Sequence, residues 1–192
     1  MAKEEGTQIA YHKNVIEFVA VAAELCHFLE SEEEMERKEW VERMLRLLAL
    51  LYLKALMLPE VEMVNEELPP TFVREEDYLR VASRISEVMG EEDIYLDVFV
   101  DEMKYSDRPI SAFVSENLAD LYQDIRNFVS VYQFELTNQM QDALAICREN
   151  FLLYWGQKLV NVLRPLHAFK CRVEESGTDE DAENLKMDEL WD

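Results

Sequence analysis

The first residues in this chain that could do chemistry are carboxylate and histidine side chains at helical spacing. Glu24 and His27 form an E-x-x-H pair, whose members share one helix face and could ligate iron. A di-iron helical bundle needs two such pairs and two further glutamates. The other histidines, His12 and His167, have no glutamate three residues upstream. The sequence therefore predicts no di-iron site, and it favours a partly buried or rim position for His27.

A ladder of glutamates could instead suggest magnesium. Helical nucleotide pyrophosphohydrolases hold this ion through an E-x-x-E pair followed by E-x-x-D on the next helix. In this chain the E-x-x-D pattern occurs only at Glu189 and Asp192, close to the C-terminus. Magnesium needs several carboxylates in near-octahedral geometry, so we expect no metal and interpret the ladder as a solvated helix face. Its members are Glu30, Glu33, Glu36, Glu39 and Glu42.

Glu116, Asp120 and Asp124 form a third acidic group, at four-residue spacing. Like charges at this spacing on a helix repel one another and cost a few tenths of a kcal/mol per pair. A cation or a basic protein partner would offset that repulsion, so these residues are a candidate binding face. A plain solvent-exposed face is the alternative.

The segment from Trp155 to His167 is the most unusual in the chain. Gly156 lies inside a long helical pattern, where glycine costs about 1 kcal/mol relative to alanine. We therefore expect the glycine to allow another helix to approach closely. Two interpretations of the segment stay open: a structural contact, or a small pocket that uses Trp155, Arg164 and His167.

The elements that must position these residues are helices. With only four glycines and five prolines the chain has few tight turns. The apolar periodicity predicts an all-α fold, an irregular bundle of about five main helices in a single domain. We expect a flexible lead-in at residues 1–13, the helical domain at 14–172 and an acidic disordered tail at 173–192. The predicted helices begin at Asn14, at Ser31, after Pro69-Pro70-Thr71, at Ser115 and near Asn138.

Two details of this prediction concern particular segments. The second helix, with its apolar second half, and the stretch Phe151–Leu166 should lie at the centre of the bundle. Residues 94–100 mix β-branched and aromatic side chains, so the helix and strand periods compete there. Because one isolated strand has no partner, we predict an irregular segment or a short helix.

The charge limits the possible partners. Nineteen basic residues against forty-one acidic ones leave a formal net charge of −22, which disfavours binding to nucleic acid and to anionic membrane surfaces. The longest apolar stretch, Leu45–Leu58, contains Arg46 and Lys54 and is shorter than the roughly 18 to 20 residues of a membrane span. The N-terminus does not look like a signal peptide.

The cysteines indicate a reducing compartment. Cys26, Cys147 and Cys171 are odd in number and scattered, and they form no C-x-x-C pair. We therefore expect free thiols, no disulfide framework and no zinc site, in a cytoplasmic protein.

Three segments together resemble a known family. They are Trp155-Gly156 with Leu163-Arg164 and Leu166-His167, the stretch Leu118–Asp124, and Phe18-Val19 with Glu24-Leu25-Cys26. The chain is similar over residues 15–169 to the bacterial family called domain of unknown function 5063. Members usually carry histidine at the position of Lys158 and commonly alanine at that of Pro165. The resemblance implies a bacterial, cytoplasmic helical domain and supplies no activity.

The sequence leaves the function unknown. Each catalytic pattern is incomplete, so we favour a non-catalytic cytoplasmic binding or adaptor protein with an acidic surface, no cofactor and a possible basic protein partner. One alternative is a metal-dependent or small-molecule-processing helical enzyme. Another is an acidic protein of the immunity or nucleic-acid-mimicking type. Leu190 and Trp191 in the tail could form a docking motif for a basic partner, and a tail that only adds solubility is the alternative. The sequence does not indicate the oligomeric state.

Overall fold

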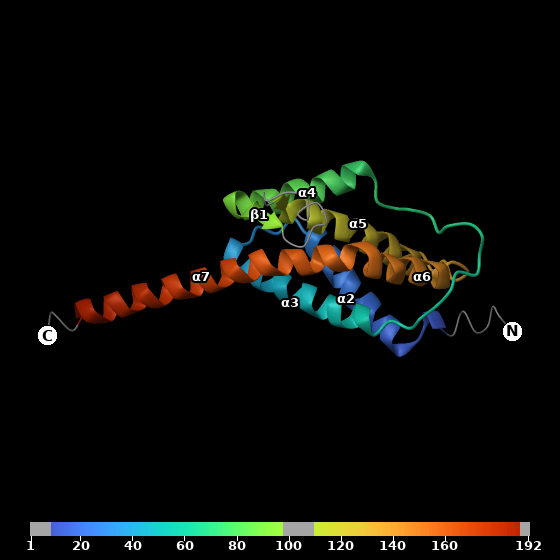
Figure 1. Cartoon of the computed structure of the whole chain (residues 1–192), viewed down its shortest axis with the longest axis horizontal. Coiled ribbons are helices and arrows are strands. Elements are labelled where there is room, and N and C mark those ends of the chain that lie inside the picture. The colour runs from blue at the N-terminus through green and yellow to red at the C-terminus, as the bar shows by residue number, and fades with distance from the viewer. Residues whose placement is uncertain (1–8, 98–109, 189–192) are drawn as a thin grey trace.

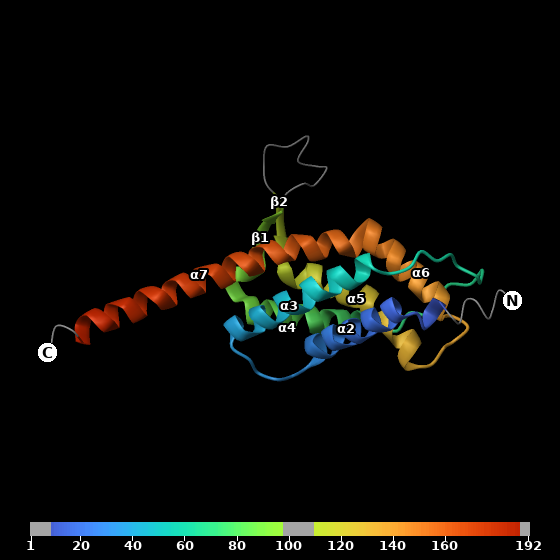
Figure 2. The same cartoon turned by 90° about the horizontal axis from the view of Figure 1, so that it is seen from below.

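The computed structural model describes residues 9–97 and 110–188 and confirms an all-α single domain. The helices pack lengthwise into an elongated body, and the C-terminal half of the last helix extends beyond it (Figures 1 and 2). The described elements are α2 (Lys13–Glu30), α3 (Arg37–Leu56), α4 (Glu75–Met89), the 3-10 turn η1 (Gly90–Asp93), β1 (Ile94–Asp97), β2 (Ile110–Phe113), α5 (Val114–Gln133), α6 (Met140–Asn150), the π-helical turn η3 (Phe151–Trp155) and α7 (Gly156–Asp188).

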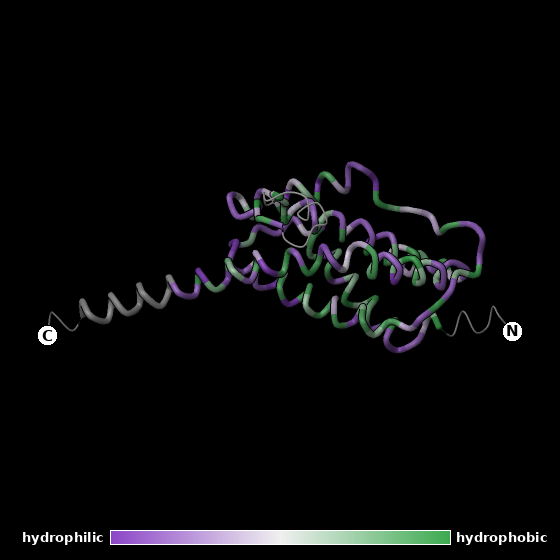
Figure 3. The backbone as a smooth tube through the Cα atoms, in the orientation of Figure 1, coloured by the Kyte–Doolittle hydropathy of each residue, from purple (hydrophilic) through white to green (hydrophobic). Residues whose placement is uncertain are grey.

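The central helix is α5, which packs against α2, α4, α6 and α7. Hydrophobic segments concentrate in the helices of the body (Figure 3). The prediction that the second helix is central was wrong, because α3 lies at the side and leaves Leu50, Leu53 and Leu56 exposed by 41%, 53% and 59%. The stretch Phe151–Leu166 does enter the core, where Trp155 and Leu166 are fully buried.

Three helices begin differently from their prediction. His12, not Asn14, is the N-cap of α2, and its Nδ1 accepts a hydrogen bond from the Asn14 backbone N–H at 3.3 Å. Ser31 ends α2 instead of starting the next helix, and α3 begins six residues later. Ser115 lies inside α5, where its N–H and hydroxyl both donate to the buried carboxylate of Asp93 at 2.8 Å. A distant carboxylate therefore satisfies the first turn of α5, which no local motif could reveal.

The segment at 94–100 is a strand where the structure describes it. Residues 94–97 form β1, which pairs antiparallel with β2 from Ile94 opposite Phe113 to Asp97 opposite Ile110. The prediction of an irregular or helical segment was wrong because it assumed that no partner strand existed. Residues 98–100 lie outside the described residues.

The predicted fifth helix is three consecutive helical elements, α6, η3 and α7. Here α7 continues through Pro165 and on to Asp188, so it includes residues 173–188 of the predicted tail. Good helix formers occur in this stretch, among them Glu180, Ala182, Glu183, Leu185, Lys186 and Met187. Arg172 also holds the helix to the body through an ion pair of 2.5 Å with Glu92. Residues 189–192, with Leu190 and Trp191, lie outside the described residues.

Part of the predicted lead-in packs on the core. Ala10 is buried, and its carbonyl accepts a 3.2 Å hydrogen bond from the hydroxyl of Tyr132. The helical body therefore begins a few residues earlier than residue 14, while residues 1–8 lie outside the described part of the chain.

Candidate functional site

The E-x-x-H pair lies on the surface of α2. His27 is exposed, and Glu24 forms an ion pair of 3.0 Å with Arg43 on α3. Within residues 9–97 and 110–188, no three histidine, cysteine or carboxylate side chains are placed to hold a metal ion. Over the same residues, no helix is long and apolar enough to cross a membrane.

The acidic face of α5 points partly into the body and is contacted from two other helices. Asp120 accepts a 3.0 Å hydrogen bond from the hydroxyl of Tyr78 on α4 and forms an ion pair with Lys158 on α7. The Lys158 ammonium also lies 4.5 Å from the ring centre of Tyr154. Glu116 is exposed at the edge of this cluster. Asp120 is thus already neutralised by the protein, and binding of an outside cation or basic partner here stays a prediction.

The three residues of the candidate pocket near the C-terminus are not brought together. Trp155 is fully buried, and its Nε1–H donates to the Cys147 carbonyl at 3.1 Å. Arg164 and His167 are both exposed, and His167 lies 3.5 Å from the thiol of Cys171. Trp155 therefore belongs to the core, and only Arg164 and His167 are available at the surface.

A different site forms under the long connection between α3 and α4. Most of this connection, residues 58–73, runs across the end of the body next to α6 (Figure 1), and the whole connection is called the strap below. Asp142 on α6 anchors its first half. The buried Asp142 carboxylate accepts hydrogen bonds from the backbone N–H of Val64 at 2.6 Å and from the side-chain amide of Asn65 at 2.5 Å.

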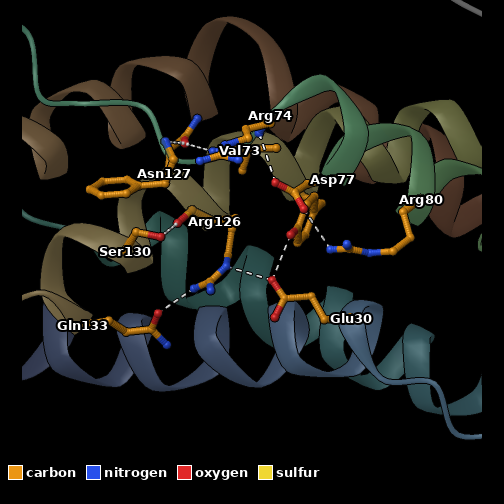
Figure 4. A network of polar contacts seen from close by, with 11 residues as sticks. Glu30, Val73, Arg74, Asp77, Arg80, Arg126, Asn127, Ser130 and Gln133 are labelled. Atoms are coloured by element: carbon orange, nitrogen blue, oxygen red, sulfur yellow. Dashed lines mark hydrogen bonds and ion pairs between the residues drawn. The ribbon is translucent and has the colours of Figure 1, made fainter.

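The end of the strap is anchored by Asn127 on α5. Its side-chain oxygen accepts from the backbone N–H groups of Phe72 at 2.6 Å and Val73 at 3.0 Å. Figure 4 shows this contact beside a second network, in which Arg126 pairs with Glu30 of α2 at 2.8 Å. The strap is therefore fixed to α6 near its middle and to α5 at its end.

Between the two anchors the strap covers a cavity of about 400 Å³, a volume within the range of small-molecule sites. One wall is the strap, and the others are α5 and α6. The lining is apolar on the strap side and mixed on the helices. It consists of Met63, Leu68, Pro69, Pro70, Thr71, Gln123, Asp124, Asn127, Phe128, Val131, Ala143, Ile146, Cys147, Glu149 and Asn150.

Asp124 is the polar centre of this cavity. Its Oδ1 accepts a 2.7 Å hydrogen bond from the side-chain amide of Asn150 on α6. Burial raises the pKa of the Asp124 carboxyl, and the charge of Asp120 adds to the rise, while the Asn150 hydrogen bond and the Lys158 charge lower it. One of the three acidic residues of α5 therefore faces the cavity wall as a desolvated carboxylate.

Sequence reasoning found Asp124 but missed the rest of this site. The signals were polar residues on otherwise apolar helix faces, Asn127 and Asp142, together with Pro69-Pro70 in a long loop. Neither residue has a partner nearby in the sequence. Their role becomes visible only when the strap is placed across α5 and α6.

The comparisons with known proteins agree with this fold. The family described as domain of unknown function, DUF5063, matches residues 9–172. The crystal structure of protein BF1032 from Bacteroides fragilis is similar, with 48% sequence identity and a TM-score of 0.75, over 84% of this chain and 95% of that chain. No curated protein matches. Both matches confirm the resemblance found in the sequence, and the chain belongs to the DUF5063 family.

Proposed function

We propose that the protein is a non-catalytic binding protein whose ligand site is the cavity under the strap. The observation that carries this proposal is the double anchoring of the strap. Asp142 holds the strap at Val64 and Asn127 holds it at Phe72, while the stretch Leu68–Thr71 between these anchors lies over open volume. A connection held in this way preserves a formed pocket, and preformed pockets with few polar groups are typical of ligand sites.

The chemistry of the lining supports binding without catalysis. Cys147 is the nucleophile in the wall, and burial raises the pKa of its thiol well above the ordinary value. A thiol kept protonated is a poor nucleophile. No histidine is present in the lining among the described residues that could act as its base. These features favour a binder over the alternative of a small-molecule-processing enzyme.

The acidic surface supports a second candidate function, capture of a basic protein partner. Glu32, Glu33 and Glu34 are all exposed before α3, and Glu75 and Glu76 are exposed at the start of α4. Binding through this surface would be strongly weakened by salt. The free thiols of the three cysteines support a cytoplasmic setting for either function.

A fragment titration followed by protein NMR tests the cavity. We expect small amphipathic fragments to shift the amide signals of the strap and of α6. Ala143 is buried and lines the cavity, so Ala143→Leu should occupy part of the volume and weaken those shifts. The matched control is Ala145→Leu, which adds the same side chain to α6 outside the lining. Identical fragment binding by the wild type and Ala143→Leu would contradict the proposed site.

A further inference from the structure

We infer that the cavity under the strap takes an organic cation, a protonated amine with an apolar body. This inference rests on the proposed function and names the class of ligand. Two carboxylates, Asp124 and Glu149, belong to the lining. No lysine, arginine or histidine does so within the described residues, so a positive group would meet no like charge in the wall.

Two basic residues outside the lining, Lys158 and Arg148, already have acidic partners. Lys158 is paired with Asp120. Arg148 lies beside Glu60, at 3.9 Å. Neither pair supplies a counter-charge inside the lining. The Lys158 charge acts on Asp124 from outside the lining, and no basic side chain of the lining contacts this carboxylate among the described residues, which leaves a place for a cationic ligand.

Asp124 offers a defined position for the ammonium group. Its Oδ1 is held by the Asn150 amide at 2.7 Å, which fixes the orientation of the carboxylate. Its other oxygen, Oδ2, accepts no hydrogen bond from the described residues. This oxygen is not fully buried either, so a ligand can reach it. That oxygen is thus open to a donor from a ligand, and a charged N–H group makes the stronger hydrogen bond.

The apolar part of the lining selects what the ammonium group is attached to. Leu68, Pro69 and Pro70 of the strap line the cavity together with Phe128 and Val131 of α5 and Ile146 of α6. An alkyl or aromatic body fits between these groups, and burying it there is favourable. A bare metal ion fits poorly, because it would need several oxygen ligands and would leave the apolar wall in contact with water.

The test compares two probes of nearly equal shape, 2-phenylethylamine and 2-phenylethanol, titrated into the full chain at pH 7 and about 0.15 M salt and followed by NMR. Physiological salt screens exposed charges beyond about 8 Å. We expect the amine to bind the wild type about 10-fold more tightly than the alcohol, a difference of about 1.4 kcal/mol.

Asp124→Asn should remove this preference and leave the affinity for the alcohol unchanged. The matched control is Glu116→Gln, which removes one negative charge from the same helix outside the lining and should keep the preference. Circular dichroism confirms that each variant is folded. The wild-type comparison of the two probes needs no variant at all.

The outcomes separate the two proposals. Equal binding of alcohol and amine to the wild type would overturn the cation inference while supporting the ligand site. Equal loss of amine binding in Glu116→Gln and Asp124→Asn would assign the preference to general surface charge and also overturn it. Binding of neither probe, together with no fragment binding, would overturn the ligand site itself.

Discussion

The side-chain amide of Asn150 donates a 2.7 Å hydrogen bond to the carboxylate of Asp124, joining α6 to α5 at the wall of the cavity. This contact orients a carboxylate that burial has partly removed from water. Because burial is the largest influence on it, the pKa of Asp124 lies above the ordinary value of 3.8 despite the hydrogen bond. A charged carboxylate at this position therefore costs the protein some stability.

Asp124→Asn should stabilise the protein at pH 7. A raised pKa in the folded state means that the folded protein holds this proton more tightly than the unfolded chain does. Its contribution is therefore fully present below pH 3.8 and is lost as the pH rises through the folded pKa. The variant has no charge to desolvate, and asparagine still offers an oxygen to Asn150.

Thermal unfolding of Asp124→Asn and the wild type between pH 3.5 and 7 measures this effect. The advantage of the variant should shrink as the pH falls. Asp120→Asn is the matched control, and it should lower stability at pH 7 because it breaks the half-buried ion pair with Lys158. A destabilised Asp124→Asn at pH 7 would show that the Asn150 contact outweighs the cost of burial.

Asp142→Ala should release the first half of the strap. Asp142 is fully buried and accepts from the Val64 N–H and the Asn65 amide. Losing hydrogen bonds to a charged acceptor and leaving a hole should cost about 3 kcal/mol in the free energy of unfolding. Urea unfolding measures that loss, and hydrogen exchange should show faster exchange at Val64 and Asn65.

Asp142→Asn keeps one acceptor oxygen and should lose less stability than Asp142→Ala. An unchanged exchange rate at Val64 in the alanine variant would mean that other contacts hold the strap in place.

The helices were predictable from the sequence because each buries one periodic apolar face, as in Val15, Phe18, Ala22 and Leu25 of α2. What the sequence could not reveal depends on partners far along the chain. The first turn of α5 is satisfied by Asp93, twenty-two residues earlier. The prediction erred at residues 94–97 for the same reason, since the partner strand starts at Ile110.

The candidate site shows the same limit. The spacing of Glu116, Asp120 and Asp124 correctly indicated one helix face, yet the three residues have different surroundings. Glu116 is exposed, Asp120 is paired with Lys158, and Asp124 lines the cavity. Periodicity assigns residues to a face but does not indicate which neighbouring element lies against each turn.

Gly156→Ala should destabilise the protein, although alanine is the better helix former by about 1 kcal/mol. A Cβ atom at Gly156 would lie 2.3 Å from the Phe151 carbonyl oxygen and 2.8 Å from its ring. The glycine therefore allows the π turn of its own helical run, where we had expected close approach of another helix. Overpacking of this kind costs about 1 to 3 kcal/mol.

Urea unfolding of Gly156→Ala measures this cost. Gln157→Ala, at the exposed next position, is the control and should change the free energy of unfolding by less than about 0.5 kcal/mol. A Gly156→Ala variant more stable than the wild type would mean that the π turn relaxes to a regular helix without penalty.

Deleting residues 174–192 should leave the melting temperature within about 2 °C of the wild type. A shift of that size corresponds to less than about 1 kcal/mol in the free energy of unfolding for a domain of this size. Among the side chains of α7 that the structure describes, Leu166 is the last that is fully buried, and the Arg172–Glu92 ion pair is retained in the deletion. The helix beyond that pair projects from the body (Figure 1), and isolated helical ends gain little stability.

A deeper truncation that also removes Leu166 is the control, and it should cost at least 2 kcal/mol through the lost burial. If the shorter deletion instead lowered the melting temperature by more than about 5 °C, the tail would be part of the folded domain, and its Leu190 and Trp191 could not be a free docking motif.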